Sequence, residues 1–178
     1  KKALGIDYDK YKISEISFDY EMMMDDVGYS INEIADIQKQ SKVGNTPLYY
    51  LSNITKLVRK YAAKGKGAKI YLKDEAANAS GSFKARRASL SVYEALKKGY
   101  KGVIAATSGN YGAAVASQAA MRGLKCIIIQ EVFDSKYIGQ PEIVEKSRIC
   151  DAMGAEVIMS SVGPELFYSL LSALEDTG

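Results

Sequence analysis

A stretch of small and polar residues, 78–87, delivers a single lysine, Lys84, to the start of a predicted helix. The positive end of a helix dipole disfavours an ammonium group, so that the neutral amine is favoured there. A neutral lysine amine is the nucleophile that forms a Schiff base with a carbonyl compound. A solvated surface lysine is the alternative interpretation, and its position alone does not decide between the two.

A second stretch, residues 107–112 (TSGNYG), lies between a predicted strand and a predicted helix. The first backbone N–H groups of a helix and the dipole together favour a bound carboxylate or phosphate. Gly109 and Gly112 would allow a ligand to approach the backbone closely. The alternative is an ordinary capped helix, because Thr, Ser and Asn are common N-cap residues.

Composition removes several other classes of site. The 178 residues contain no His, which excludes Ser-His and Cys-His nucleophile pairs and His-ligated metals. Two distant cysteines, Cys126 and Cys150, are too few for a thiolate metal site, so we expect no metal, reduced thiols and a cytoplasmic setting. The net charge of +3 predicts no nucleic-acid partner, and no apolar run is long enough for a membrane helix.

Helices and strands alternate at short spacing from residue 85 onward. This alternation predicts an α/β fold in which a parallel sheet has helices on both faces and ligands lie beyond the carboxyl ends of the strands. The expected elements are helices over 85–98 and 110–122, from Pro141 to before Gly154, and from Pro164, and strands over 103–106, 126–130 and 156–159.

The part of the chain before residue 78 is less regular. Residues 1–45 show no clear period and predict an arm of short helices that packs on a larger body. Short strands are expected over 48–51 and 70–73, with a helix over 53–61 between them.

Three motifs in a fixed order resemble a known family. Residues 80–86 (SGSFKAR) resemble the Schiff-base segment of the pyridoxal-phosphate enzymes of the tryptophan synthase β-subunit fold. Residues 107–110 (TSGN) resemble their asparagine loop, and residues 44–48 (GNTPL) resemble the motif that begins their folded body. The resemblance implies a three-layer α/β fold with a parallel sheet.

Within this family, residues 73–88, 106–126 and 162–168 resemble the β-subunits of 2-amino-4-oxopentanoate thiolases. The resemblance implies cleavage of that amino acid with CoA to acetyl-CoA and alanine, in ornithine breakdown. It implies that Lys84 is the catalytic residue that binds pyridoxal 5'-phosphate and that Asn110 contacts the cofactor ring. Substrate-binding residues would be Thr107, Ser108, Gly109 and Tyr111.

The Gly-rich loop with which the family holds the cofactor phosphate cannot be located, because Val162-Gly-Pro has no glycine cluster. We therefore expect an N-terminal portion of the subunit. Residues 1–78 would form the arm and part of the large cofactor domain, and residues 79–178 a small mobile lobe that carries the lysine and asparagine loops.

The resemblance also implies partners, namely a small α-subunit, further copies of the chain, CoA and an amino-acid substrate. Two alternatives stay open. Threonine synthase and diaminopropionate ammonia-lyase share the Ser-Phe-Lys segment, so an eliminating or replacing enzyme is the first. A non-catalytic binding module of the same fold is the second, although such a module has no need of Lys84.

Overall fold

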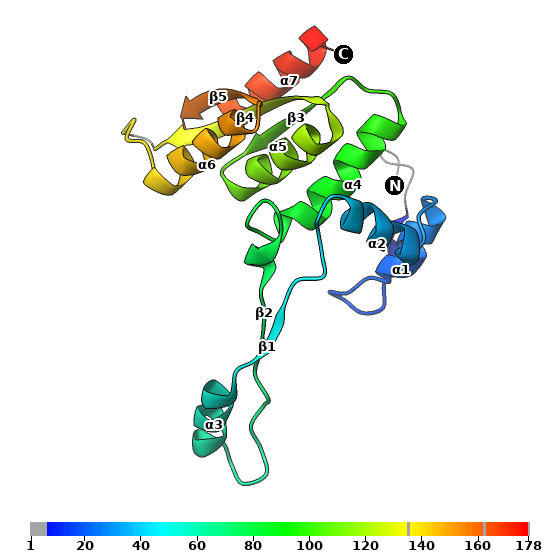
Figure 1. Cartoon of the computed structure of the whole chain (residues 1–178), viewed down its shortest axis with the longest axis vertical. Coiled ribbons are helices and arrows are strands. Elements are labelled where there is room, and N and C mark those ends of the chain that lie inside the picture. The colour runs from blue at the N-terminus through cyan, green and yellow to red at the C-terminus, as the bar shows by residue number, and fades with distance from the viewer. Residues whose placement is uncertain (1–6, 135, 162, 178) are drawn as a thin grey trace.

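The computed structural model (Figure 1) describes residues 7–134, 136–161 and 163–177. Val162, which belongs to one of the resembling stretches, lies outside these residues. Among the described residues no helix is both long and apolar enough to cross a bilayer. The elements follow the order η1 (Tyr8–Tyr11), α1 (Tyr20–Asp26), α2 (Ile31–Gln40), β1 (Leu48–Tyr50), α3 (Ser52–Tyr61), β2 (Tyr71–Lys73), η2 (Glu75–Ala77), α4 (Lys84–Lys97), β3 (Gly102–Thr107), α5 (Asn110–Arg122), β4 (Lys125–Phe133), α6 (Pro141–Ala152), β5 (Glu156–Ser161) and α7 (Glu165–Thr177).

Three parallel strands in the order β3-β4-β5 form the main sheet. The connecting helices α5 and α6 contact each other and cover one face, and α7 contacts all three strands from the other face (Figure 1). The predicted three-layer α/β architecture is therefore confirmed. Because the strands are parallel, the ends of β3 and β4 and the start of α5 meet at one edge of the sheet.

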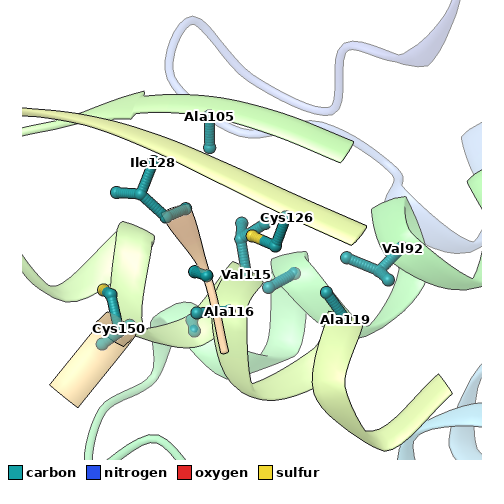
Figure 2. Packing of buried hydrophobic residues seen from close by; sticks show 12 residues of the cluster. Val92, Ala105, Val115, Ala116, Ala119, Cys126, Ile128 and Cys150 are labelled. Carbon is teal, nitrogen blue, oxygen red and sulfur yellow. The ribbon is translucent and has the colours of Figure 1, made fainter. Parts of the chain in front are cut away.

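Small side chains let α5 pack closely on the sheet (Figure 2). Ala113, Ala116 and Ala119 of α5 are fully or almost fully buried against residues such as Ile128 of β4. Gly112 marks the closest approach, because an added Cβ would lie 2.7 Å from Thr107 Cγ2 and 2.9 Å from Ile128 Cγ2. This packing fixes the first turn of α5 against the end of β3.

The N-terminal arm consists of short helices that pack on the body, as predicted. Helix α2 contacts α4, which in turn packs along α5. The Tyr29 hydroxyl, between α1 and α2, donates a hydrogen bond to the Glu94 carboxylate of α4. Lys97 of the same helix lies over the Tyr29 ring, 4.8 Å from its centroid. The arm therefore supports the outer side of the helix that begins at Lys84.

Strands β1 and β2 pair only with each other among the described strands, in an antiparallel two-stranded sheet. Together with α3 they project away from the body (Figure 1). All residues of both strands are exposed, including Leu48, Tyr49 and Leu72.

Two details differ from the sequence prediction. The leucines and Phe167 of the last helix lie on one side of it at helical spacing, but this side is only partly covered, because Leu166 is buried while Phe167, Leu171 and Leu174 are exposed. Strand β4 continues past the predicted end at residue 130 to Phe133. At the predicted end, the buried Gln130 amide donates a hydrogen bond from Nε2 to the Ile143 carbonyl at 3.2 Å, while its Oε1 has no hydrogen-bond partner among the described residues.

Candidate functional site

A cavity of about 1030 Å³ opens at the carboxyl ends of β3 and β4. Lys84 from the start of α4 lines one side, and the loop that joins β3 to α5 lines another. All six residues singled out from the sequence therefore meet in one place. They are Lys84, Thr107, Ser108, Gly109, Asn110 and Tyr111.

Lys84 lies at the start of α4, as the sequence predicted, and is its first residue, one position before the predicted helix start at residue 85. Its side chain is half-buried and lines the cavity, with Nζ 4.8 Å from the centroid of the Phe83 ring. The loop before it turns at Gly81, whose φ of +74° suits glycine and where an added Cβ would contact nothing within 4 Å. The structure thus presents the lysine amine at the wall of the cavity.

The hydroxyl of Thr107 caps the first turn of α5. Its Oγ1 accepts hydrogen bonds from the backbone N–H groups of Gly109 at 3.0 Å and Gly112 at 3.3 Å. The capping interpretation therefore holds for Thr107, whose side chain is buried. The amides of Asn110 and Tyr111, the first two residues of α5, have no partner within the helix. They and the exposed Ser108 remain able to bind an anion.

The lysine loop holds two further polar groups. The hydroxyls of Ser80 and Ser82, on either side of Gly81, are buried and have no hydrogen-bond partner in the structure. Unpartnered buried hydroxyls are uncommon, because each forfeits the hydrogen bonds that it made with water. Two such groups in the loop that leads to Lys84 fit a polar ligand rich in hydrogen-bond acceptors.

Sequence reasoning missed the wall formed by β4, α6 and α7. Arg87, which lies over the Tyr111 ring at 4.8 Å, was also not assigned to the site. The same rule on the carboxyl ends of parallel strands, applied to β4 as well as to β3, would have found most of this wall. Its residues are Glu131, Gln140, Glu142, Ile143, Glu145, Lys146 and Leu166.

The two cysteines lie outside the cavity, in the packed core (Figure 2). Burial raises the pKa of the Cys126 thiol to about 12 and that of Cys150 to about 11. Both cysteines are free thiols. Because their pKa values lie well above 7, both thiols are protonated at neutral pH. Since the thiolate is the nucleophilic form, neither cysteine is suited to carry an acyl group.

Comparison with protein families gives one match over most of the chain. The model for the pyridoxal-phosphate dependent enzymes matches residues 39–175. The chain is 66% identical over 178 residues to the 2-amino-4-ketopentanoate thiolase beta subunit of Acetoanaerobium sticklandii, which covers all of this chain and 38% of that protein. It is 42% identical over 86 residues to a threonine synthase of a Bacillus species, which covers 48% of this chain and 22% of that protein.

Solved structures with the same fold include maize serine racemase, with a TM-score of 0.64 and 29% identity over 83% of this chain and 41% of that chain. A cysteine synthase from Entamoeba histolytica has a TM-score of 0.62 and 28% identity over 77% of this chain and 39% of that chain. The chain therefore spans well under half the length of the proteins that it resembles.

Proposed function

The chain belongs to the pyridoxal-phosphate dependent enzyme family, and on that premise we propose that it forms the lysine- and asparagine-bearing portion of a 2-amino-4-oxopentanoate thiolase β-subunit. The observation that carries the proposal is the meeting of Lys84 with residues 107–111 at one cavity. The identity of 66% to the A. sticklandii subunit supports this reaction in preference to those of other family members.

The residues around the cavity fit the cofactor. The amine of Lys84, on the cavity wall, would hold pyridoxal 5'-phosphate covalently. The buried hydroxyls of Ser80 and Ser82, for which the described residues provide no partner, lie in the loop that leads to it. The side-chain amide of Asn110 would donate a hydrogen bond to the ring oxygen. When bound, the cofactor supplies an electron sink for the carbon skeleton of the amino acid.

The start of α5 would hold the substrate carboxylate. The backbone N–H groups of Asn110 and Tyr111 and the hydroxyl of Ser108 can donate to it, and the helix dipole favours its negative charge. Gly109 leaves this approach open, since no atom lies within 4 Å of the position that a Cβ would take. Thr107 contributes by fixing the turn through its cap.

Thiolysis of 2-amino-4-oxopentanoate breaks the bond between C3 and C4. The acetyl group passes to a thiol sulfur, and C3 takes up a proton to give alanine. Lys84 is the amine at the cavity wall that we assign to the proton transfer. Because Cys126 and Cys150 are buried and protonated, neither is suited to accept the acyl group, and we assign that role to the thiol of CoA itself or to a group outside residues 1–178, such as one on the partner subunit.

The remaining parts of the proposal concern the whole protein. Residues 79–178 would form a small mobile lobe, and the loop for the cofactor phosphate would lie in sequence outside this chain. A small α-subunit and further copies of the β-subunit would complete a cytoplasmic enzyme of ornithine breakdown. The name of the A. sticklandii relative, a beta subunit, supports the α-subunit partner.

Borohydride reduction of the full-length enzyme tests the assignment of Lys84. We expect mass spectrometry to find the cofactor attached to Lys84 and the Lys84→Ala variant to lose it. Lys146→Ala is the matched control, because Lys146 is another amine on the wall of the same cavity and its loss should leave attachment unchanged. Attachment at any lysine other than Lys84 would overturn the assignment.

Product analysis tests the reaction. Incubation with 2-amino-4-oxopentanoate and CoA, with the partner subunit present, should give acetyl-CoA and alanine in equal amounts. Release of ammonia without acetyl-CoA would instead identify an eliminating enzyme, the class that the similarity to threonine synthase represents. Cofactor binding without any turnover would identify a binding module.

A further inference from the structure

A network of polar side chains lies on the other side of α4 from the cavity. The Glu75 carboxylate accepts hydrogen bonds from Arg86 Nε at 2.7 Å and Arg86 Nη2 at 2.8 Å. It also accepts from the Thr46 hydroxyl at 2.8 Å and from Asn78 Nδ2 at 2.9 Å. Thr46 and Asn78 are buried, so the ion pair between Glu75 and Arg86 is partly enclosed by polar partners.

The network ties both ends of the lysine loop to a third segment of the chain. Asn78 begins the loop, and its Oδ1 accepts a hydrogen bond from the Gly44 backbone N–H at 2.9 Å. Arg86 lies just beyond the other end of the loop, two residues after Lys84. Its backbone carbonyl accepts a hydrogen bond from Gln38 Nε2 at 3.2 Å. The loop between these anchors therefore cannot shift without breaking contacts at one end.

A bidentate arginine–carboxylate pair is suited to this task, because its two parallel hydrogen bonds fix an angle as well as a distance. Arg86 and Lys84 are two positions apart on a helix, so their side chains leave α4 on opposite sides. The bonds to Arg86 hold the pKa of the Glu75 carboxyl well below its usual range, at about 2. The pair is therefore charged on both sides at any pH at which the enzyme works.

We infer that Glu75 and Arg86 are positioning residues that hold the loop 78–83 so that the Lys84 amine faces the cavity. This inference rests on the proposed function only for the role of Lys84. The hydrogen bonds between Glu75 and Arg86, here called the clamp, are present in the structure whatever the chain does. The pair acts through the backbone of α4 and contacts neither cofactor nor substrate.

The test uses the full-length protein and the variants Glu75→Gln, Arg86→Gln and Arg86→Lys and the double variant Glu75→Gln/Arg86→Gln. Glu94→Gln is the control, because Glu94 lies near the other end of the same helix and contacts Lys98 and the Tyr29 hydroxyl, away from the lysine loop. Without cofactor, amide hydrogen exchange of residues 78–86 is measured. We expect it to rise at least tenfold in Glu75→Gln and Arg86→Gln and to stay unchanged in the control.

The two single variants and the double variant should behave alike, because each breaks the same contact. Arg86→Lys keeps the charge but not the paired hydrogen bonds, so an intermediate value is expected. Unchanged exchange of residues 78–86 in both single variants would overturn the clamp.

The second measurement is the rate at which pyridoxal phosphate becomes attached to Lys84 in the cofactor-free protein. A positioning role predicts a fall of at least tenfold in Glu75→Gln and Arg86→Gln and partial recovery in Arg86→Lys. A merely structural role would lower the melting temperature and leave this rate unchanged, which would overturn the inference. If the wild-type protein attaches no cofactor at Lys84, the proposed function fails, and hydrogen exchange still decides whether the clamp exists.

Discussion

Residues at the start of α5 and in the loop just before it have separate roles in the proposed site. The Asn110 amide would contact the cofactor, and the Ser108 hydroxyl would contact the substrate carboxylate. Both residues line the same cavity, so their roles would differ in what each side chain contacts and not in where it lies. Spectroscopy and kinetics can therefore separate the two roles, although the residues are only two positions apart in the sequence.

Asn110→Ala should shift the visible absorption of the bound cofactor and lower turnover. Ser108→Ala should leave the spectrum nearly unchanged and raise KM about ten- to a hundredfold, since one hydrogen bond to a charged group is worth about 1.5–3 kcal/mol. Absorption spectra, KM and melting temperatures of both variants provide the check. Two variants that lose only about 1 kcal/mol of stability, with spectrum and KM intact, would favour plain helix capping.

The buried thiols make stability depend on pH in the alkaline range. Cys126 and Cys150 keep their protons in the folded state, whereas the unfolded thiols release theirs above about pH 9. The unfolded state then binds fewer protons, so the free energy of unfolding should fall by up to about 1.4 kcal/mol per pH unit for each thiol. This contribution is complete below pH 9 and is lost as the pH rises towards the folded-state values.

Denaturant unfolding between pH 8.5 and 10.5 measures this slope. The variant Cys126→Ala/Cys150→Ala should show a shallower decline than the wild-type protein, because the other titrating groups are the same in both. Equal slopes would mean that the two thiols ionise as readily in the folded state as in the unfolded one.

At the scale of elements, Gly112 sets how closely α5 approaches the sheet. Alanine within a helix is ordinarily more favourable than glycine by about 0.5–1 kcal/mol. Here the added Cβ would meet Thr107 and Ile128 at less than 3 Å, and overpacking of this kind costs about 1–3 kcal/mol. We expect Gly112→Ala to lower the melting temperature and, by displacing the first turn of α5, to raise KM. A higher melting temperature would contradict the close packing.

Elements whose ends are marked by turn or capping residues could be predicted from the sequence. The Ala-rich helix over 110–122 has the predicted bounds, because Ser108-Gly109 precedes it and Gly123 ends it in the left-handed conformation. The division of α7 could not be predicted, since its leucines and aromatic residues form one broad side and only the folded chain shows which of them the sheet covers. The pairing of β1 with β2 could not be predicted either, because α3 separates them and no short turn marks a hairpin.

The same reasoning explains which parts of the site were found. Lys84 and residues 107–111 stand out because small and polar side chains surround them at the start of helices. The wall formed by Glu131 and the start of α6 has ordinary charged side chains whose convergence depends on the crossover between β4 and β5. Only the folded sheet shows that these carboxylates line the same cavity as the lysine.

At the scale of the whole molecule, strands β1 and β2, here called the hairpin, form a two-stranded sheet whose two outer edges pair with no other described strand. Its side chains Leu48, Tyr49, Tyr50, Tyr71 and Leu72 are each about half exposed. Unpaired strand edges with apolar side chains readily pair with other chains. We expect a polypeptide of residues 1–178 to self-associate, as measured by sedimentation, and Leu72→Lys to reduce the association.

Leu96→Lys is the matched control for this prediction. Leu96 is a similarly exposed leucine on α4, away from the hairpin, and its replacement should have little effect. A polypeptide that stays monomeric at high concentration, or that responds equally to both substitutions, would show that the open edges are not what associates.

The order β3-β4-β5 along the main sheet has a consequence for biosynthesis. Each strand pairs with the next one in the chain, and only a single helix separates the partners. Each pairing closes a loop of one crossover only, so its cost in chain entropy is smaller than for strands far apart in the sequence. The sheet that carries the asparagine loop can therefore assemble as soon as α7 has left the ribosome, and later-made chain meets a surface that is already ordered.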